Sequence, residues 1–121
     1  LKVVCKVSEN LSENKCEACS IDAVVLTEQE ISELLPRVPS WIVHEEEDIK
    51  RLFCSFAFTD YESSVNFTNL VAKLAEEEDH HPEIVLEWGN VTVSWWSHKI
   101  KGLHKNDFIC ASKTDDLFKN L

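Results

Sequence analysis

The spacing of apolar and polar positions changes along the chain and divides it into elements of secondary structure. Between residues 51 and 58, apolar side chains recur at every second position, which is typical of a strand with one buried face. Between residues 60 and 79 they recur at the three- and four-residue spacing of an amphipathic helix, which Pro82 cannot continue. The pattern therefore predicts a half-buried strand followed by a long helix that ends shortly before Pro82.

Capping residues mark the starts of two helices. Thr27 is followed three residues later by Glu30, a capping-box pattern that predicts a short helix ending before Pro36. Thr59 and Glu62 repeat this pattern, so we expect them to cap the long helix.

The dipeptide Gly89-Asn90 separates two short apolar stretches. A two-residue loop that begins with glycine is typical of a tight β-hairpin. A loop at these residues pairs Trp88 with Val91 and, farther along the strands, places His81 opposite His98. The same register places Trp88 on the apolar face of the hairpin, where we expect it to pack in the core.

The elements follow the order helix, two strands, helix, two strands, helix (α-β-β-α-β-β-α). They are a short helix from residue 27, strands on either side of 46–48, a helix at 60–79, hairpin strands at 83–88 and 91–96, and a weaker helix at about 105–119. This order favours an α+β fold in which helices pack on one face of a four-stranded antiparallel sheet. We expect one domain at 25–121, preceded by a mobile N-terminal extension at 1–24, and removal of residues 1–20 should leave the fold nearly intact.

The charge of the chain limits its partners. Asp and Glu number 22 against 12 Lys and Arg, which gives a formal net charge of −10. Because nucleic-acid binding depends on neutralising phosphates with Lys and Arg, nucleic acid is not expected as a direct partner. No apolar run approaches the roughly 18 residues of a membrane-spanning helix, so we expect no membrane partner and a soluble, cytoplasmic protein.

Among the five cysteines, one pair has the spacing of a metal or redox motif. Cys16 and Cys19 form the sequence CEAC, but there is no second Cys-x-x-Cys to complete a four-ligand zinc site. The polar flanks of the pair disfavour a thioredoxin-like role. An odd number of cysteines without a secretory signal indicates reduced thiols, so the favoured interpretation is two thiols in a mobile extension.

Three histidines are expected to converge where the long helix meets the hairpin. His80 and His81 stand just before Pro82, and the hairpin register brings His98 beside them. A lone histidine more often packs with its ring satisfied, but three neighbouring imidazoles favour a functional site. Zinc accepts three histidines, yet adjacent residues in an extended chain point to opposite faces, so a metal site is the less favoured alternative. Imidazole titrates nearest to neutrality, which makes general acid and base catalysis the favoured hypothesis.

The residues around these histidines resemble the signature of a known family. The pattern E-x3-H-H-P-x5-W-x9-H-x8-D is similar to that of the pterin-4a-carbinolamine dehydratases, and the likeness extends over about residues 27 to 118. It includes Ser40-Trp41 and the stretches FAFTDY at 56–61 and KGLHKND at 101–107. The positions that match the signature are Glu76, His80, His81, Pro82, Trp88, His98 and Asp107.

The resemblance implies an enzyme that dehydrates 4a-hydroxytetrahydropterin to quinonoid dihydropterin and so recycles the pterin cofactor of aromatic amino acid hydroxylases. It implies acid and base roles for His80 and His98, and it gives His81 a part in holding the pterin as well as in the catalytic group. It implies no metal and no organic cofactor.

Four further residues are expected to contact the substrate. They are Glu76, Trp41, Trp96 and Asp107. Three of them have simpler alternatives: a solvated helix face for Glu76, core packing for Trp41, and a favourable charge at a helix start for Asp107.

The resemblance also implies partners and one competing function. Family members are homodimers or homotetramers joined through sheet edges and long helices, so we expect a homo-oligomer, with an aromatic amino acid hydroxylase as a further partner. The competing function is a non-catalytic binding module that acts as a dimerisation cofactor of a transcription regulator. Retention of all three histidines favours the enzyme.

Overall fold

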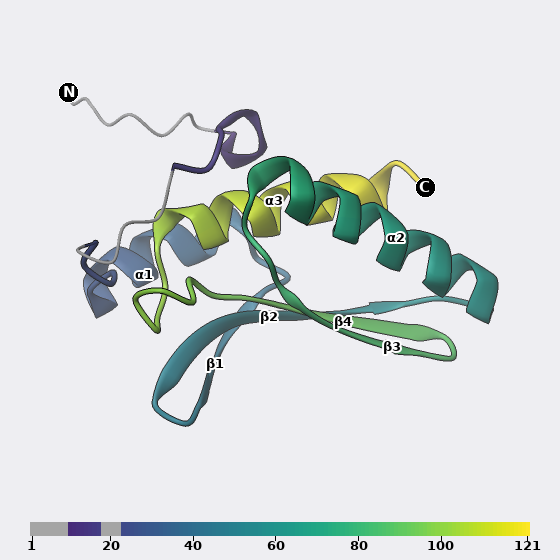
Figure 1. Ribbon diagram of the computed structural model, residues 1–121, viewed down its shortest axis with the longest axis horizontal. Helices are drawn as coiled ribbons and strands as arrows, with labels where there is room; N and C mark the ends of the chain where they lie inside the picture. The colour runs from purple at the N-terminus through teal and green to yellow at the C-terminus, as the bar shows by residue number, and fades with distance from the viewer. Residues whose placement is uncertain (1–9, 18–22) are drawn as a thin grey trace.

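The computed structural model describes residues 10–17 and 23–121, and its helices and strands follow the predicted order (Figure 1). The elements are η1 (Leu11–Glu13) and η2 (Leu35–Arg37), which are short 3₁₀ helices, α1 (Glu28–Leu34), β1 (Ile42–Glu46), β2 (Ile49–Ala57), α2 (Tyr61–Glu78), β3 (Glu83–Glu87), β4 (Asn90–Trp95) and α3 (Lys105–Lys119). Cys19, the second cysteine of the CEAC motif, lies outside the described residues.

The four strands form one antiparallel sheet in the order β1-β2-β4-β3. Helices α2 and α3 lie across one face of this sheet, so the molecule has two layers with the core between them (Figure 1). The side chains of β2 that were predicted to face inward do so, because Leu52, Cys54 and Phe56 are all buried. The α+β fold with helices on one face of the sheet is confirmed.

One edge of β2 is only partly paired. β1 pairs with residues 49–53 of β2, while residues 54–57 pair with β4 alone within the described part of the chain. A partly unpaired strand offers hydrogen-bonding groups to a further strand.

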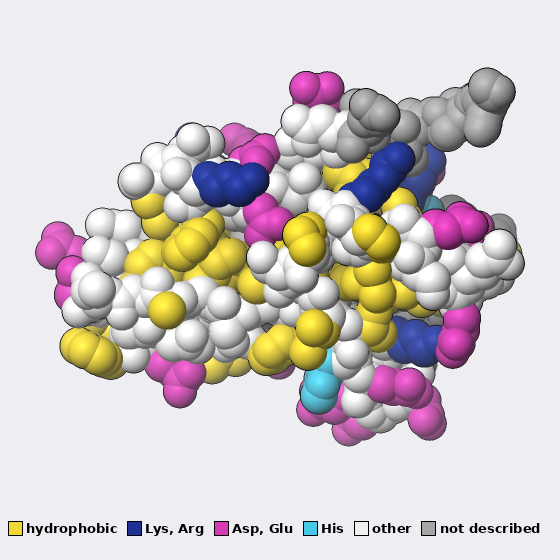
Figure 2. Space-filling view, turned by 180° about the vertical axis from the view of Figure 1, so that it is seen from behind, with side chains coloured by type: hydrophobic (Ala, Val, Ile, Leu, Met, Phe, Trp, Pro, Cys, Tyr) yellow, Lys and Arg dark blue, Asp and Glu magenta, His cyan; other side chains and the backbone are white. Residues whose placement is uncertain are grey.

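On the face opposite to that of Figure 1, hydrophobic side chains spread across the middle and acidic side chains lie around them (Figure 2).

The helix starts agree with the predictions in one case and differ in the other. Thr27 and Glu30 form the predicted capping box of α1, with both hydrogen bonds present. The cap of α2 is Asp60, whose carboxylate accepts a hydrogen bond from the backbone N–H of Ser63 at 2.7 Å. The prediction of Thr59 as the cap is therefore wrong, since the adjacent carboxylate takes that role.

The β3–β4 hairpin differs from the prediction in its loop. Glu87 pairs with Asn90, so the two-residue loop is Trp88-Gly89 and not Gly89-Asn90. Gly89 has a φ of +75°, and a Cβ at this position would lie 3.1 Å from the carbonyl oxygen of Phe58. The loop therefore needs glycine at its second position.

The change of loop shifts the register by two residues, which leaves the paired side chains of β3 and β4 on their predicted faces. Because of the shift, His81 is not paired with His98 in the sheet. Trp88 lies at the tip of the hairpin and is 71% exposed, so the prediction that it packs in the core is wrong.

The described part of the predicted extension packs against the domain. Leu11, in η1, is only 2% exposed and joins the core beside α3. The side-chain amide of Asn106 accepts a hydrogen bond from the N–H of Glu17 at 2.9 Å and donates one to its carbonyl at 2.7 Å. The division of the chain at residues 24 and 25 stays a prediction, but residues 10–17 have the contacts of an integral segment.

We expect Leu11→Ala to lower the free energy of unfolding by about 2 to 5 kcal/mol, because a buried leucine is replaced by a smaller side chain that leaves a cavity. Leu121→Ala is the matched control, since Leu121 is 61% exposed. Urea unfolding of both variants tests this. Equal stability of the two variants would show that the extension is dispensable, as the sequence alone suggested.

Candidate active site

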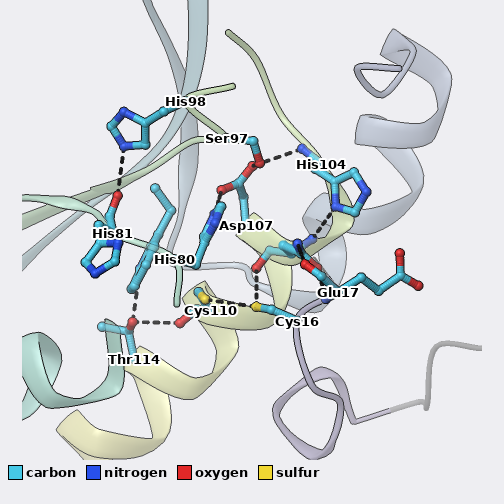
Figure 3. Close-up of polar contacts among 12 residues, drawn as sticks. Cys16, Glu17, His80, His81, Ser97, His98, His104, Asp107, Cys110 and Thr114 are labelled. Atoms are coloured by element: carbon cyan, nitrogen blue, oxygen red, sulfur yellow. Dashed lines mark hydrogen bonds and ion pairs between the residues drawn. The ribbon is translucent and has the colours of Figure 1, made fainter. Parts of the chain in front are cut away.

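A cavity of about 600 Å³ opens where α2 ends, β3 begins and the chain leaves β4. It is lined by Cys16, Glu17, Glu78, Asp79, His80, His81, His98 and Lys99. The three histidines predicted to converge therefore share one cavity, and the close-up in Figure 3 shows how their rings lie.

His80 points into the protein because of how α2 ends. Asp79 adopts the left-handed conformation with a φ of 52°, and the N–H of His80 bonds back to the carbonyl of Ala75 at 3.1 Å. The imidazole of His80 is 7% exposed and lies parallel to the indole of Trp95, with 5.8 Å between ring centroids. Its Nε2 is 2.6 Å from Oδ1 of Asp107 (Figure 3). The ring is therefore fixed both by stacking and by a hydrogen bond.

Asp107 is a fully buried carboxylate in the first turn of α3. Besides His80, it accepts hydrogen bonds at Oδ2 from the hydroxyl of Ser97 and from the backbone N–H of His104, each at 2.9 Å. A buried carboxylate needs such donors, and a carboxylate held in place can fix the orientation and tautomer of a histidine. Asp107 therefore contacts His80 but does not itself line the cavity.

Sequence reasoning missed Ser97 and His104. His104 stands three residues before Asp107, which is the spacing of a capping box, and the structure forms that box. Histidine is not among the usual capping residues, so the spacing was not recognised. Ser97 carries no local signal, because its partner lies ten residues away across the fold.

His81 and His98 form the exposed side of the site. Nε2 of His98 donates to the carbonyl oxygen of His81 at 2.8 Å, and Nε2 of His81 is 2.8 Å from a carboxylate oxygen of Glu76. The predicted proximity of these two histidines is confirmed, although a hydrogen bond beyond the strand ends produces it and not pairing within the sheet. The side chain of Glu76 therefore holds one nitrogen of the His81 ring.

The three histidines share one feature. Each ring is anchored through Nε2 to an oxygen atom: a carboxylate for His80 and His81, and a carbonyl for His98. Within the described chain, no hydrogen bond involves Nδ1 of any of the three. In the neutral tautomer that these contacts favour, Nδ1 carries the lone pair and can accept a proton.

The ring of Trp96 packs against the ring of His98. Its ring centroid is 4.4 Å from that of His98, and the guanidinium of Arg51 lies 4.0 Å from the centroid of the Trp96 ring. Trp96 therefore lies next to a residue of the candidate site, but it is not among the residues that line the cavity, and its contact with the substrate stays a prediction.

Trp41 lies in the core and not at the cavity. Its side chain is 3% exposed, packs edge-on against Phe56 and donates through Nε1 to Asp115 at 3.0 Å. Burial raises the pKa of Asp115 above its usual range. The structure therefore does not bring Trp41 to the three histidines.

Two findings bear on cofactors and membranes. In residues 10–17 and 23–121, no group of three or more His, Cys, Asp and Glu side chains is placed to hold a metal ion. In the same residues, no helix has the length and apolar character needed to cross a membrane.

Comparison with known proteins identifies the family. The model of the family described as pterin 4 alpha carbinolamine dehydratase matches residues 24–117. The chain therefore belongs to the pterin-4a-carbinolamine dehydratase family, as its signature residues suggested.

Relatives support this membership over nearly their whole length. A protein of Vibrio vulnificus is 55% identical over 109 residues, which cover 90% of this chain and 99% of that protein. A protein of Nitrosococcus oceani is 54% identical over 112 residues, which cover 93% of this chain and 99% of that protein. Each is provisionally named a pterin-4-alpha-carbinolamine dehydratase.

Two solved structures share the fold. A transcriptional coactivator/pterin dehydratase from Brucella melitensis matches with a TM-score of 0.70 and 29% identity, covering 78% of this chain and 98% of that chain. A pterin dehydratase-like protein, identified as a RuBisCO assembly factor in the alpha-carboxysome, matches with a TM-score of 0.55 and 25% identity, covering 64% of this chain and 88% of that chain.

The cap of α3 should make stability depend on pH. Burial lowers the pKa of His104 below its ordinary value of 6.5, and its neutral Nδ1 accepts a hydrogen bond from the N–H of Asn106 at 3.1 Å. Because the unfolded chain binds the proton more readily, this contribution to stability is present above about pH 6.5 and is lost as the pH falls toward the lowered pKa.

We expect the change His104→Asn to reduce the loss of stability between pH 7.5 and pH 5.5, because asparagine caps a helix without titrating. The measurement is the urea midpoint of the variant and of the unchanged protein at both pH values. The two proteins differ only at residue 104, so the difference between their losses of stability reports on that residue. An equal loss in the two proteins would contradict the role given to His104.

Proposed function

We propose that this protein dehydrates 4a-hydroxytetrahydropterin to quinonoid dihydropterin, with histidines as general acid and base. Membership of the family supports the substrate class. The observation that carries the proposal is that His80, His81 and His98 line one cavity and are each anchored through Nε2, which leaves their Nδ1 atoms without a hydrogen bond in the described chain.

The reaction needs a proton at one atom and releases a proton from another. The hydroxyl group on C4a must gain a proton to leave as water, while the proton on N5 is taken by a base. The N5–H electrons then form the double bond to C4a as the C4a–O bond breaks. One proton is donated and one is accepted, so an acid and a base near neutral pH can complete the cycle without a redox partner.

The surroundings of His80 suit it to this chemistry. Asp107 accepts from Nε2, which favours the tautomer with Nδ1 unprotonated, and its negative charge stabilises the imidazolium that forms when Nδ1 takes a proton. His98 lines the same cavity from the chain that follows β4. We assign His80 and His98 to the acid and base pair.

Binding of the pterin is assigned to the exposed side of the site. His81 and Glu76 are 54% and 78% exposed at their side chains, so a substrate can reach them without unfolding any element. Trp96 packs against the ring of His98, and Asp107 is hydrogen-bonded to the ring of His80. In this proposal both act by positioning a histidine. Trp41 is left out because its indole is in the core.

The proposal carries expectations about partners. A dehydratase of this kind would recycle the pterin cofactor of an aromatic amino acid hydroxylase. The partly unpaired edge of β2 suits pairing with a second copy of the chain in a homodimer or homotetramer. The acid and base chemistry proposed here uses no metal.

A second candidate is a non-catalytic binding module that helps a transcription regulator to dimerise. One structural relative is called both a transcriptional coactivator and a pterin dehydratase, which supports keeping this alternative. A surface-binding role would not depend on the Nδ1 atoms, so substitutions of the histidines distinguish the two functions.

We expect His98→Ala to lower the turnover of 4a-hydroxytetrahydropterin by about 10²-fold, because the variant lacks a group that transfers a proton. The melting temperature should stay nearly unchanged, because the ring of His98 is exposed and contributes little to the core. His80→Gln should have a similar effect on turnover, since the amide can still donate to Asp107 but cannot carry a proton between groups. His81→Ala should raise the Michaelis constant more than it lowers turnover. The decay of the 4a-hydroxypterin absorbance measures all three.

His44→Ala is the matched control, because His44 is an exposed histidine of β1 whose ring lies 5.8 Å from that of Phe53 and does not line the cavity. The uncatalysed dehydration must be subtracted at each pH. Turnover close to that of the control in both His80→Gln and His98→Ala would rule out the assigned acid and base, and absence of activity in the unchanged protein would favour the binding module.

A further inference from the structure

Two cysteines that are far apart in sequence meet beside the candidate site. Cys16 follows η1, and Cys110 lies in the middle of α3, yet their sulfur atoms are 3.4 Å apart (Figure 3). Cys16 is half-buried, and Cys110 is fully buried. The sequence had grouped Cys16 with Cys19 and had given Cys110 no partner, so this pair emerges only in the fold.

The backbone on both sides of Cys16 is held in place. Its N–H donates to a carboxylate oxygen of Glu78 at 3.0 Å, and the next residue, Glu17, forms two hydrogen bonds with the side chain of Asn106. Lys113 in turn lies 3.2 Å from the carboxylate of Glu78. The approach of the two sulfurs is therefore supported by contacts with α2 and α3.

We propose that Cys16 and Cys110 form a reversible disulfide that fastens residues 10–17 to α3. Bond formation requires the sulfurs to approach by roughly 1.4 Å, from 3.4 Å to a bond length of about 2.0 Å. Cys16 stands on a short segment outside the regular helices and strands, so the movement needs no change within α3.

The oxidant is a small disulfide, RSSR, of the glutathione type. The thiolate of Cys16 attacks one sulfur of RSSR, which forms a mixed disulfide and releases RS⁻. The sulfur of Cys110 then attacks the Cys16 sulfur, which forms the protein disulfide and releases the second RS⁻. The two protein thiols lose two electrons, RSSR gains them, and the two thiol protons end on two RSH molecules.

The environments of the cysteines set this order of attack. The hydrogen bond with Cys16 and then burial raise the pKa of Cys110, so its thiol stays protonated and reacts poorly with reagents in solution. Once Cys16 is in the mixed disulfide, that hydrogen bond is lost and an electrophilic sulfur is adjacent. The exposed surface of Cys16 makes it the point of entry.

The disulfide would change the cavity wall. Cys16 and Glu17 line the cavity beside His80, and residues 10–17 are joined to the domain by Leu11, by hydrogen bonds and by the ion pair of Glu17 with Lys105. While the disulfide is present, residues 10–17 cannot separate from α3, so this wall of the cavity stays in place. This inference concerns a thiol site and does not depend on the dehydratase activity.

The test is to equilibrate the full-length protein in buffers with oxidised and reduced glutathione, to block free thiols, and to map the peptides by mass spectrometry. We expect a Cys16–Cys110 cross-linked peptide that accumulates with the oxidised form and disappears with dithiothreitol. The melting temperature should rise by roughly 10 °C on oxidation, because the bond closes a long loop in the unfolded chain. The rise should be absent in Cys110→Ala and in Cys16→Ala.

Cys54→Ala is the matched control, because Cys54 is also buried but its sulfur donates to the carbonyl oxygen of Ser55 at 3.8 Å and has no hydrogen bond with another cysteine in the described residues. It should keep both the cross-link and the rise in melting temperature. A cross-link between Cys16 and Cys19 as the main product, or a glutathione adduct on Cys16 that persists while Cys110 stays free, would overturn the proposal. Peptide mapping of the unchanged protein gives this answer even if a variant fails to fold.

Discussion

The hydrogen bond between Nε2 of His80 and the carboxylate of Asp107 is the contact on which the candidate site depends. Asp107 is fully buried, and leaving a buried polar group without a hydrogen-bond partner generally costs about 1 to 3 kcal/mol. The carboxylate is satisfied by His80, by the hydroxyl of Ser97 and by the N–H of His104. Because these donors belong to different segments, one carboxylate fixes the end of α2, the chain after β4 and the start of α3 relative to one another.

Local signals predicted the elements well because each signal is satisfied within a few residues. The capping box of Thr27 and the alternation along β2 needed no knowledge of the rest of the chain. The errors occurred where two local solutions compete. Thr59 and Asp60 are both good caps, and only the backbone geometry selects Asp60. A glycine can take the first or the second place of a two-residue loop, and the contact of Gly89 with Phe58 is not visible in the sequence.

Contacts between distant segments could not be predicted from spacing. Ser97 meets Asp107, and Cys16 meets Cys110, only after α3 has packed against the sheet and η1 against α3. The residue type of Trp41 likewise does not show where its side chain lies. An indole can stack on a flat ligand or pack in the core against Phe56, and both surroundings suit an aromatic ring. The signature found the three histidines, since they lie at the ends of elements that the sequence defines, but it did not reveal which ring nitrogen each one offers.

The site combines one rigid histidine, His80, with a neighbour, His81, that is free to adapt. The hydrogen bond of His81 with Glu76 is exposed to water, and such exposed pairs contribute about 0 to 1 kcal/mol. A ligand can therefore displace that contact at little cost. His80 has no such freedom, because its ring is stacked on Trp95 and hydrogen-bonded to a buried carboxylate. Proton transfer needs a donor or acceptor held in place, while binding needs groups that rearrange around the ligand. The burial of Asp107 on one side and the exposure of Glu76 on the other give neighbouring histidines these two different properties.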